Sequence, residues 1–244
     1  MGHDIRDGLR GKEGCPRDGN RARLARMGAA AAAEILPPEP TNTPSTVSSR
    51  SMTFDQWVNM AEDEPGEFVD GKLVEEEMPS ILHEIIVSWI IGVLRAWGPA
   101  RGYPVFGSEL KVRVAKARGR KPDVSMYPAG TRFRDAAFSR KPPMLIVEVV
   151  SRASRDVKRD RLEKRREYAK FGVQHYWLVD PDARLFEFLT LGPDGRWREE
   201  TESASEGRVE VAGFDGLTLD LDELWSEAER ILEEGEDEFV DDEP

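Results

Sequence analysis

The chain has 244 residues, of which 39% are hydrophobic and 34% charged, which is long enough to bury one substantial core. Its single cysteine, Cys15, excludes a scaffold built on disulfides and favours the reducing cytoplasm as its location. The longest apolar stretches are far shorter than the roughly 18 to 20 residues that a membrane span requires. The composition therefore predicts a cytoplasmic globular protein without a membrane partner.

The net charge of −12 hides an uneven distribution along the chain. Residues 110–171 hold 19 Lys and Arg against 7 Asp and Glu, whereas residues 201–244 hold 2 against 17. The basic middle of the chain allows a polyanionic partner such as nucleic acid in spite of the acidic average. The same charges could instead solvate the surface or pair within and between molecules.

The composition divides the chain into three regions. Residues 1–51 are rich in Gly, Arg, Ala and Pro without a helical or alternating apolar pattern, and we predict a disordered leader. Residues 52–232 are expected to form the folded domain. Residues 233–244 are expected to be an acidic, disordered tail because they lack apolar residues that could join a core.

Apolar spacing and turn signals predict the elements of the domain in chain order. Thr53 and Gln56 form a capping box, and Asp70-Gly71 is a two-residue hairpin signal. The predicted elements are a helix at 53–62, strands at 67–69 and 72–75, a long helix at 79–97, strands at 109–114, 122–127 and 144–150, a charged helix at 155–171, strands at 173–179, 184–189 and 196–200, and a last helix at 221–232. Since helices lie before and after the apolar strand 144–150, we expect an α/β fold with a central mixed sheet flanked by helices.

Glu148 is unusual because it is an ionisable residue inside the apolar strand 144–150. A buried carboxylate costs several kcal/mol unless it is paired or bound to a cation. Asp123 begins another predicted strand, and two carboxylates brought together on neighbouring strands repel each other. A Mg²⁺ ion would remove that repulsion, polarise a phosphoryl oxygen and activate water. Taken singly, an Asp after a Pro is commonly a turn or strand-edge residue.

The order of Pro122-Asp123 and a hydrophobic strand holding Glu148 resembles the PD-(D/E)XK nuclease core. A longer pattern, from about residue 52 to about residue 232, resembles the Uma-type (Uma-two) family of restriction endonucleases. Its matching motifs are Glu67-Phe-Val-Asp-Gly-Lys-Leu-Val74, Pro79 with His83, Pro122-Asp-Val124, Val147-Glu-Val-Val-Ser151, Asp160 with Lys164, Tyr168, and Gly172-Val-Gln-His-Tyr-Trp-Leu-Val-Asp-Pro181. The resemblance implies a restriction-endonuclease-like core, a DNA substrate, and Mg²⁺ or Mn²⁺ held by Asp123 and Glu148.

The lysine of the nuclease motif is displaced in this chain. The usual motif has a lysine two positions after the glutamate, where this chain has Val150. In the Uma-type family a lysine on the next helix takes that place, and the matching residue here is Lys164. A helix that crosses the sheet beside Glu148 could bring this lysine into the metal site. Alternatively, Asp160 and Lys164 could form an ordinary ion pair within the helix.

Four further ionisable residues are candidates for a site or for a structural role. The resemblance makes Glu67 an additional acid, because the family pattern also has an acid at this position. Glu109 is expected to face solvent. His83 matches a histidine of the family pattern, although a lone histidine more often caps a helix or borders a core. His175 stands where the family commonly has an acidic residue, and we expect it to be structural.

Three functions fit these features. The first is a Mg²⁺-dependent endonuclease that hydrolyses DNA phosphodiester bonds, with Asp123, Glu148 and Lys164 as catalytic residues. The second is a catalytically inactive nuclease-fold module for binding or assembly, which the displaced lysine favours. The third, with less support, is a small-molecule phosphodiesterase. A homodimer would suit a duplex substrate, which has two strands to cut.

Overall fold

The computed structural model describes residues 50–60, 66–74, 79–150 and 157–234, all within the unit Ser45–Pro244. The predicted leader therefore lies outside the described residues except for strand β1 (Arg50–Ser51), which pairs with β3 (Lys72–Val74). The predicted acidic tail lies outside them except for two residues at the end of α4 (Leu221–Glu234). The domain boundaries at 51 and 232 remain predictions.

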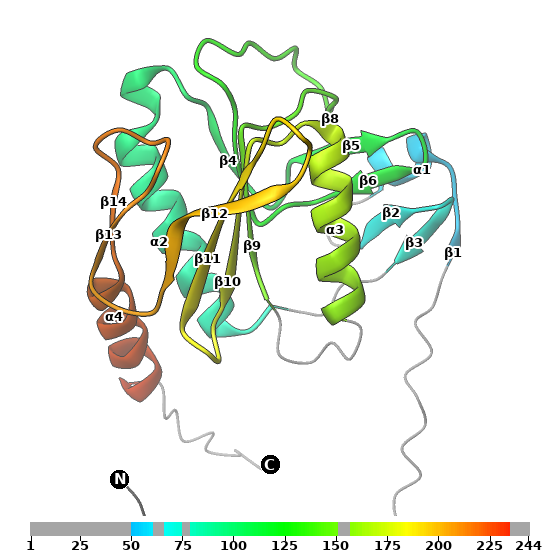
Figure 1. Cartoon of the computed structure of the whole chain (residues 1–244). Coiled ribbons are helices and arrows are strands. Elements are labelled where there is room, and N and C mark those ends of the chain that lie inside the picture. The colour runs from blue at the N-terminus through cyan, green and yellow to red at the C-terminus, as the bar shows by residue number, and fades with distance from the viewer. Residues whose placement is uncertain (1–49, 61–65, 75–78, 151–156, 235–244) are drawn as a thin grey trace, which may run out of the picture. The chain divides into compact units, whose positions relative to one another are not determined.

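A six-stranded mixed sheet forms the centre of the fold, in the order β12-β11-β10-β9-β7-β4 (Figure 1). Strands β9 and β10 are parallel, and every other neighbouring pair is antiparallel. The strands are β4 (Val105–Gly107), β7 (Val124–Met126), β9 (Leu145–Val149), β10 (His175–Asp180), β11 (Leu185–Leu191) and β12 (Trp197–Ala204). The predicted central mixed sheet is confirmed, with β9 between two neighbours.

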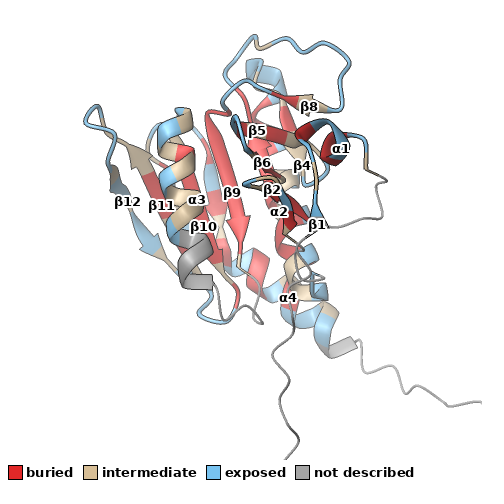
Figure 2. Ribbon diagram, turned by 90° about the vertical axis from the view of Figure 1, so that its right-hand side faces the viewer, coloured by how far each residue is buried: buried red, intermediate tan, exposed pale blue. Residues whose placement is uncertain are grey.

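Side chains of β9 alternate between two buried faces of this sheet, since successive residues of a strand point in opposite directions. Leu145, Val147 and Val149 join the core that includes α2 (Ile81–Trp97) and α4. Ile146 lies on the opposite face, in a core with Tyr168 of α3 (Val157–Phe171) and residues of β5 (Lys111–Ala115). Figure 2 shows β9 as a strand that is buried along its whole length. Helices therefore cover both faces, as predicted, and Glu148 shares the α3 side with Ile146.

Helix α2 follows the predicted apolar spacing closely. Ser80 caps its first turn by accepting a hydrogen bond from the backbone N–H of His83 at 3.2 Å. By length and composition alone, Ile81–Arg101 could cross a membrane, but a core helix passes the same test. Here Ile86, Ile90 and Leu94 are completely buried in the core between α2 and the sheet. The apolar face of α2 is thus explained by packing.

A second six-stranded sheet has the order β1-β3-β2-β6-β5-β8. Its further strands are β2 (Glu67–Val69), β5 (Lys111–Ala115), β6 (Arg118–Arg120) and β8 (Phe138–Ser139). The predicted hairpin is present, and both of its turn residues, Asp70 and Gly71, have positive φ angles of 50° and 80°. Because β2 also pairs with β6, residues near position 67 lie beside those near position 120.

Several predictions of local structure need correction. The first helix, α1 (Phe54–Val58), has the predicted capping box but ends at Val58, well before residue 62, because Asn59 caps it. Strands β4, β6 and β8 were not predicted, nor was the hairpin of β13 (Arg208–Glu210) and β14 (Thr218–Asp220) that precedes α4. The short 3-10 helix at Pro99–Arg101 was not predicted either. Each of these elements has only two or three residues, too few to establish a periodic pattern.

Candidate active site

Two carboxylates meet where β7 and β9 run side by side. The register pairs Val124 with Val147, so the next pair in this antiparallel ladder is Asp123 with Glu148, on the same face of the sheet. The Asp123 carboxylate is fixed there because its Oδ2 accepts a hydrogen bond from the backbone N–H of Val149 at 2.7 Å. The chain thus places the two predicted acids next to each other.

Helix α3 brings a cation and a hydroxyl to Glu148. Lys164 Nζ lies 3.0 Å from Glu148 Oε2, and the Tyr168 hydroxyl donates to Glu148 Oε1 at 2.5 Å. Lys164 and Tyr168 are four residues apart and therefore share one face of the helix. The helix ends just beyond them at Gly172, whose φ of 93° permits the left-handed turn into β10. The displaced lysine does reach the buried glutamate from the next helix.

Glu67 of β2 lies in the same cluster, but its two oxygens are engaged by other groups. Arg120 Nη1 lies 2.5 Å from Glu67 Oε2, and the backbone N–H of Lys121 donates to Oε1 at 3.1 Å. Lys164 Nζ lies 3.4 Å from the same Oε1. Arg120 in turn holds Glu167 of α3 with two hydrogen bonds of 2.8 and 3.0 Å. Lys164 therefore bridges two buried carboxylates whose positions are fixed from different elements.

Burial and neighbouring charges shift the pKa values of Glu148 and Glu67 in opposite directions. Burial raises the pKa of Glu148 to about 7, and the negative charges of Asp123 and Glu67 add to this against the attraction of Lys164. Burial would also raise the pKa of Glu67, but Arg120 and Lys164 together hold it below its ordinary value. A cation at the Asp123–Glu148 end of the cluster would therefore relieve repulsion.

His83, near the start of α2, is the second partner of Asp123. Its Nε2 lies 3.4 Å from Asp123 Oδ1, while Nδ1 lies 3.5 Å from Glu84 Oε1. Although burial lowers the pKa of His83, the bond to Asp123 outweighs it and the net shift is upward. From the sequence, His83 matches a histidine of the family pattern, and a capping or core-bordering role is the more common one for a lone histidine. The backbone of His83 is indeed capped by Ser80, but the ring faces the site.

The structure separates the remaining candidates from this cluster. The side chain of Glu109 is 69% exposed and pairs with Lys121 Nζ at 3.2 Å, as a solvent-facing residue should. His175 packs its ring against Phe214 at 4.6 Å, far along β10 from Glu148. The side chain of Asp160 lies outside the described residues, so its predicted pairing with Lys164 remains a prediction.

Arg120 and Glu167 are the members of the cluster that the sequence did not reveal. Arg120 stands in a basic run from residue 116 to 121, and Glu167 stands in a helix full of charges. Nothing in such a run distinguishes a buried cation from solvated ones. One weak signal is present in the sequence. The strand Arg118–Arg120 comes shortly before Asp123, so Arg120, the partner of Glu67, is close to a site acid along the chain.

The donor set fits a hard divalent cation. Asp123 and Glu148 offer carboxylate oxygens, which are the ligands that Mg²⁺ prefers, and Mg²⁺ commonly retains several waters and needs only one or two carboxylates. Within the described part of the chain, no group of three or more His, Cys, Asp and Glu side chains is placed to form a metal site by itself. Two carboxylates completed by water and by substrate oxygens are therefore the arrangement that these residues can support.

Comparison with known proteins identifies the class and the family. The mixed sheet with helices on both faces, carrying this charged cluster on its central strand, is that of a restriction-endonuclease-like α/β protein. The family model Uma2, described as "Putative restriction endonuclease", matches residues 52–222, and the chain belongs to this family.

One solved structure gives independent support for the fold. It is the crystal structure of a nuclease, described as putative and belonging to DUF820, from Anabaena variabilis. The two structures superpose with a TM-score of 0.57 at 23% sequence identity, over 72% of this chain and 99% of that chain. At this identity the likeness shows a shared fold. No curated protein matches the chain.

Proposed function

We propose that the chain is a divalent-metal-dependent endonuclease that hydrolyses DNA phosphodiester bonds, with Mg²⁺ or Mn²⁺ as cofactor. The observation that carries the proposal is Glu148, a buried carboxylate with a raised pKa that has Asp123 beside it and Lys164 at 3.0 Å. Perturbed ionisable groups of this kind gather at functional sites. Membership of a restriction-endonuclease family supports the nuclease activity and the DNA substrate.

The residues of the cluster divide the work of such a reaction. Asp123 and Glu148 would hold the metal ion, which supplies charge neutralisation and a more acidic water when bound. Lys164 presents an ammonium that can orient the attacking water or neutralise charge that develops on the phosphate.

The neighbouring groups act as positioning residues. The Tyr168 hydroxyl fixes one oxygen of Glu148, and His83 faces one oxygen of Asp123. Glu67, itself anchored by Arg120, holds Lys164 from the second sheet. Pre-organised groups of this kind avoid reorganisation at the moment of reaction.

The test is cleavage of supercoiled plasmid and of single-stranded DNA with Mg²⁺, with Mn²⁺ and with chelator. We expect nicked or linear plasmid with either metal and none with chelator. Lys164→Met should abolish the products, whereas the matched control Lys116→Met, which removes an exposed lysine, should not. Intact DNA under every metal condition, from a protein shown to be folded, would overturn the proposal.

A catalytically inactive binding module is the second candidate, and one observation favours it. Lys164 lies between Glu148 and Glu67, so the buried charges are partly balanced without a metal. Isothermal titration with Mn²⁺ separates the candidates, because the module should bind DNA without binding the metal. Metal binding that Asp123→Asn removes would favour the enzyme.

A further inference from the structure

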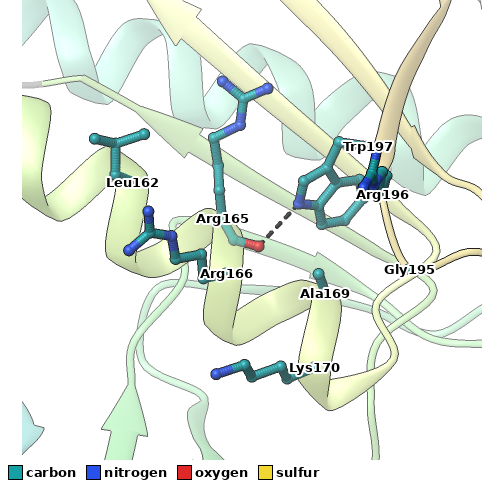
Figure 3. A pocket seen from close by; sticks show the side chains of 8 residues that line it. All are labelled: Leu162, Arg165, Arg166, Ala169, Lys170, Gly195, Arg196 and Trp197. Atoms are coloured by element: carbon teal, nitrogen blue, oxygen red, sulfur yellow. Dashed lines mark hydrogen bonds between the residues drawn. The ribbon is translucent and has the colours of Figure 1, made fainter.

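The outer side of α3 borders a basic groove away from the charged cluster around Glu148. The groove lies between α3 and the turn that joins β11 to β12, and its volume is about 430 Å³ (Figure 3). Arg165, Arg166 and Lys170 line it from the helix, Arg196 lines it from the turn before β12, and Trp197 lines it from the first position of β12. None of its lining residues is acidic.

The side chains of Arg165, Arg166 and Lys170 form no ion pair or hydrogen bond with another described residue. Arg196 donates its backbone N–H to Asp194 Oδ1 at 3.3 Å, and this bond, together with the charges of Arg198 and Arg196, lowers the pKa of Asp194. Asp194, on the adjoining turn, is paired with Arg198 at 3.3 Å. The acids Glu163 and Glu167 of α3 are turned to the other side of the helix. Unpaired cations on one wall raise the local positive potential and attract polyanions.

Ion pairs on the opposite side of α3 explain why its acidic and basic side chains lie on different sides. Arg118 lies 3.3 Å from Glu163, and Arg120 holds Glu167 at 2.8 Å. The acids of this part of the helix are therefore used to attach it to β6, and its outer cations remain available. Arg166, Lys170 and Arg196 are exposed, which leaves their charged ends accessible to a partner.

Trp197 gives the groove a fixed aromatic wall. Its indole N–H donates to the backbone carbonyl of Arg165 at 2.8 Å (Figure 3). Its ring packs 5.8 Å from that of Tyr176. The side chain that faces it from α3 is the small Ala169, which leaves space above the ring. Cations beside a partly exposed aromatic ring are the combination that nucleic-acid grooves use for phosphate attraction and base stacking.

The groove and the charged cluster are presented by one helix. Lys164 faces Glu148, while the next residue, Arg165, lines the groove. An α-helix with its side chains is about 10–12 Å across. Since a DNA strand advances about 3.4 Å per phosphate along the helix axis, a strand at Glu148 reaches the groove within a few nucleotides.

We propose that this groove binds the phosphate backbone of the DNA substrate beside the scissile phosphate. The proposal rests on the proposed function, since it places the groove on the path of the same substrate. Phosphate contacts of this kind fix the register and orientation of DNA without reading its sequence. The groove would thus hold the strand while the cluster around Glu148 acts on it.

The test compares two variants of equal charge in binding to a short labelled duplex, measured by fluorescence anisotropy with chelator present. The groove variant is Arg166→Gln, Lys170→Gln and Arg196→Gln. The control variant is Lys72→Gln, Arg95→Gln and Arg230→Gln, which removes three exposed cations elsewhere. We expect the groove variant to bind at least about fivefold more weakly, with a shallower salt dependence by about one unit per lost phosphate contact. The control should change binding less than twofold.

The outcomes separate this proposal from the proposed function. Equal weakening in both variants would overturn the groove proposal, even if the wild-type protein cleaves DNA. A groove-specific loss of binding in a protein that never cleaves would support DNA binding by the groove, but it would contradict the nuclease and, with it, the placement of the groove beside a scissile phosphate. A change in oligomeric state confined to the groove variant, measured by light scattering with DNA binding intact, would assign the groove to a second copy of the chain and overturn the proposal.

Discussion

Glu148 is a buried carboxyl group whose two oxygens are bound by Lys164 and Tyr168. Burial and the adjacent carboxylates raise its pKa to about 7, so near neutrality the metal-free protein holds it partly protonated. A residue in this state contributes little to stability as a carboxylate. A buried carboxylate with a raised pKa is typical of a functional site, which agrees with the metal-binding role that we propose for it.

Glu148→Gln and Asp123→Asn should therefore abolish metal-dependent cleavage while leaving the fold intact. Each change removes a charged ligand at nearly constant shape, and we expect the cleavage rate to fall at least about 100-fold. Plasmid cleavage and far-ultraviolet circular dichroism check the two parts of the prediction. Glu109→Gln, which alters an exposed carboxylate outside the cluster around Glu148, is the matched control. Undiminished cleavage by both site variants would contradict the assignment.

His175 should make the protein less stable in mild acid. Burial lowers the pKa of His175 below that of the unfolded chain, with Glu200 opposing the shift. Below about pH 6.5 the unfolded state therefore binds more protons at this residue, and its contribution to stability is lost as the pH falls. The free energy of unfolding of His175→Gln, measured by urea denaturation from pH 7.5 to 5.5, should decline less than that of the wild type.

His83 provides a control of opposite sign for this experiment. Its pKa is raised in the folded protein, so protonation in mild acid stabilises the native state, and His83→Gln should lose that gain. Comparing each variant with the wild type at every pH isolates its own histidine from other titrating groups. Parallel pH curves for the wild type and His175→Gln would contradict the prediction.

At the scale of elements, Arg120 connects three of them. Its side chain is 2% exposed and joins Glu67 of β2 to Glu167 of α3 from its own strand, β6. These attachments hold α3 in the position at which Lys164 contacts Glu148. The cluster around Glu148 therefore depends on a residue that need not touch the substrate.

Arg120→Met should destabilise the protein by about 3–5 kcal/mol, because it leaves Glu67 buried without its main partner. Arg118 on the same strand is the matched control, since it also pairs with acids but its side chain is 21% exposed. Arg118→Met should cost about 1 kcal/mol or less. Guanidinium denaturation measures both values. Similar losses for the two variants would show that the buried attachment is no stronger than the surface one.

The sequence predicted the elements that have a strong periodic signal. Helix α2, the Asp70-Gly71 hairpin and the apolar strand β9 are specified by local spacing, which is independent of the rest of the chain. Strand β6, with the sequence Arg-Gly-Arg, has no such signal because its stability comes from β2 and β5 on either side. Short strands of this kind can be predicted only when the strands that pair with them are known.

The predicted site residues were found by a different kind of signal. Glu148 stands out because it is ionisable within an apolar strand, and Asp123 is a second carboxylate at the start of another predicted strand, whereas Lys164 follows from the family resemblance. The structure brings these three together with Glu67, although its contacts assign Glu67 to Arg120. Long-range pairing of that kind, across more than fifty residues, leaves no mark on local sequence.

At the scale of the whole molecule, the charges are divided between a basic segment, residues 110–171, and an acidic segment, residues 201–244. Residues 235–244, beyond the end of α4, hold six acidic residues and no basic ones. A polyanion in the same chain as the basic segment 110–171 has a high effective concentration near it and competes with DNA phosphates. We expect the removal of residues 235–244 to tighten DNA binding at low salt.

Salt distinguishes this effect from a change in the fold. The gain in affinity should shrink as ionic strength rises, because screening weakens both competitors. Fluorescence anisotropy on a short duplex measures it at several salt concentrations. A full-length variant with the six acids replaced by Asn and Gln should match the shortened protein, since charge and not length is the cause. Equal affinities of the shortened and wild-type proteins at every salt concentration would contradict the prediction.

The separation in sequence of the ion pairs also implies an order of assembly. Glu148 meets Lys164 and Tyr168 across 16 and 20 residues, whereas Glu67 meets Arg120 across 53. Closing the longer loop costs about 1 kcal/mol more in chain entropy. We therefore expect β9, α3 and β10 to be structured in the folding transition state before the second sheet docks. In stopped-flow kinetics, Ile146→Val should slow folding, while Phe68→Leu should mainly speed unfolding. The reverse pattern would contradict this order.

In the expected order, Glu148 pairs with Lys164 early in folding. The core therefore never encloses the charge of Glu148 without a compensating cation.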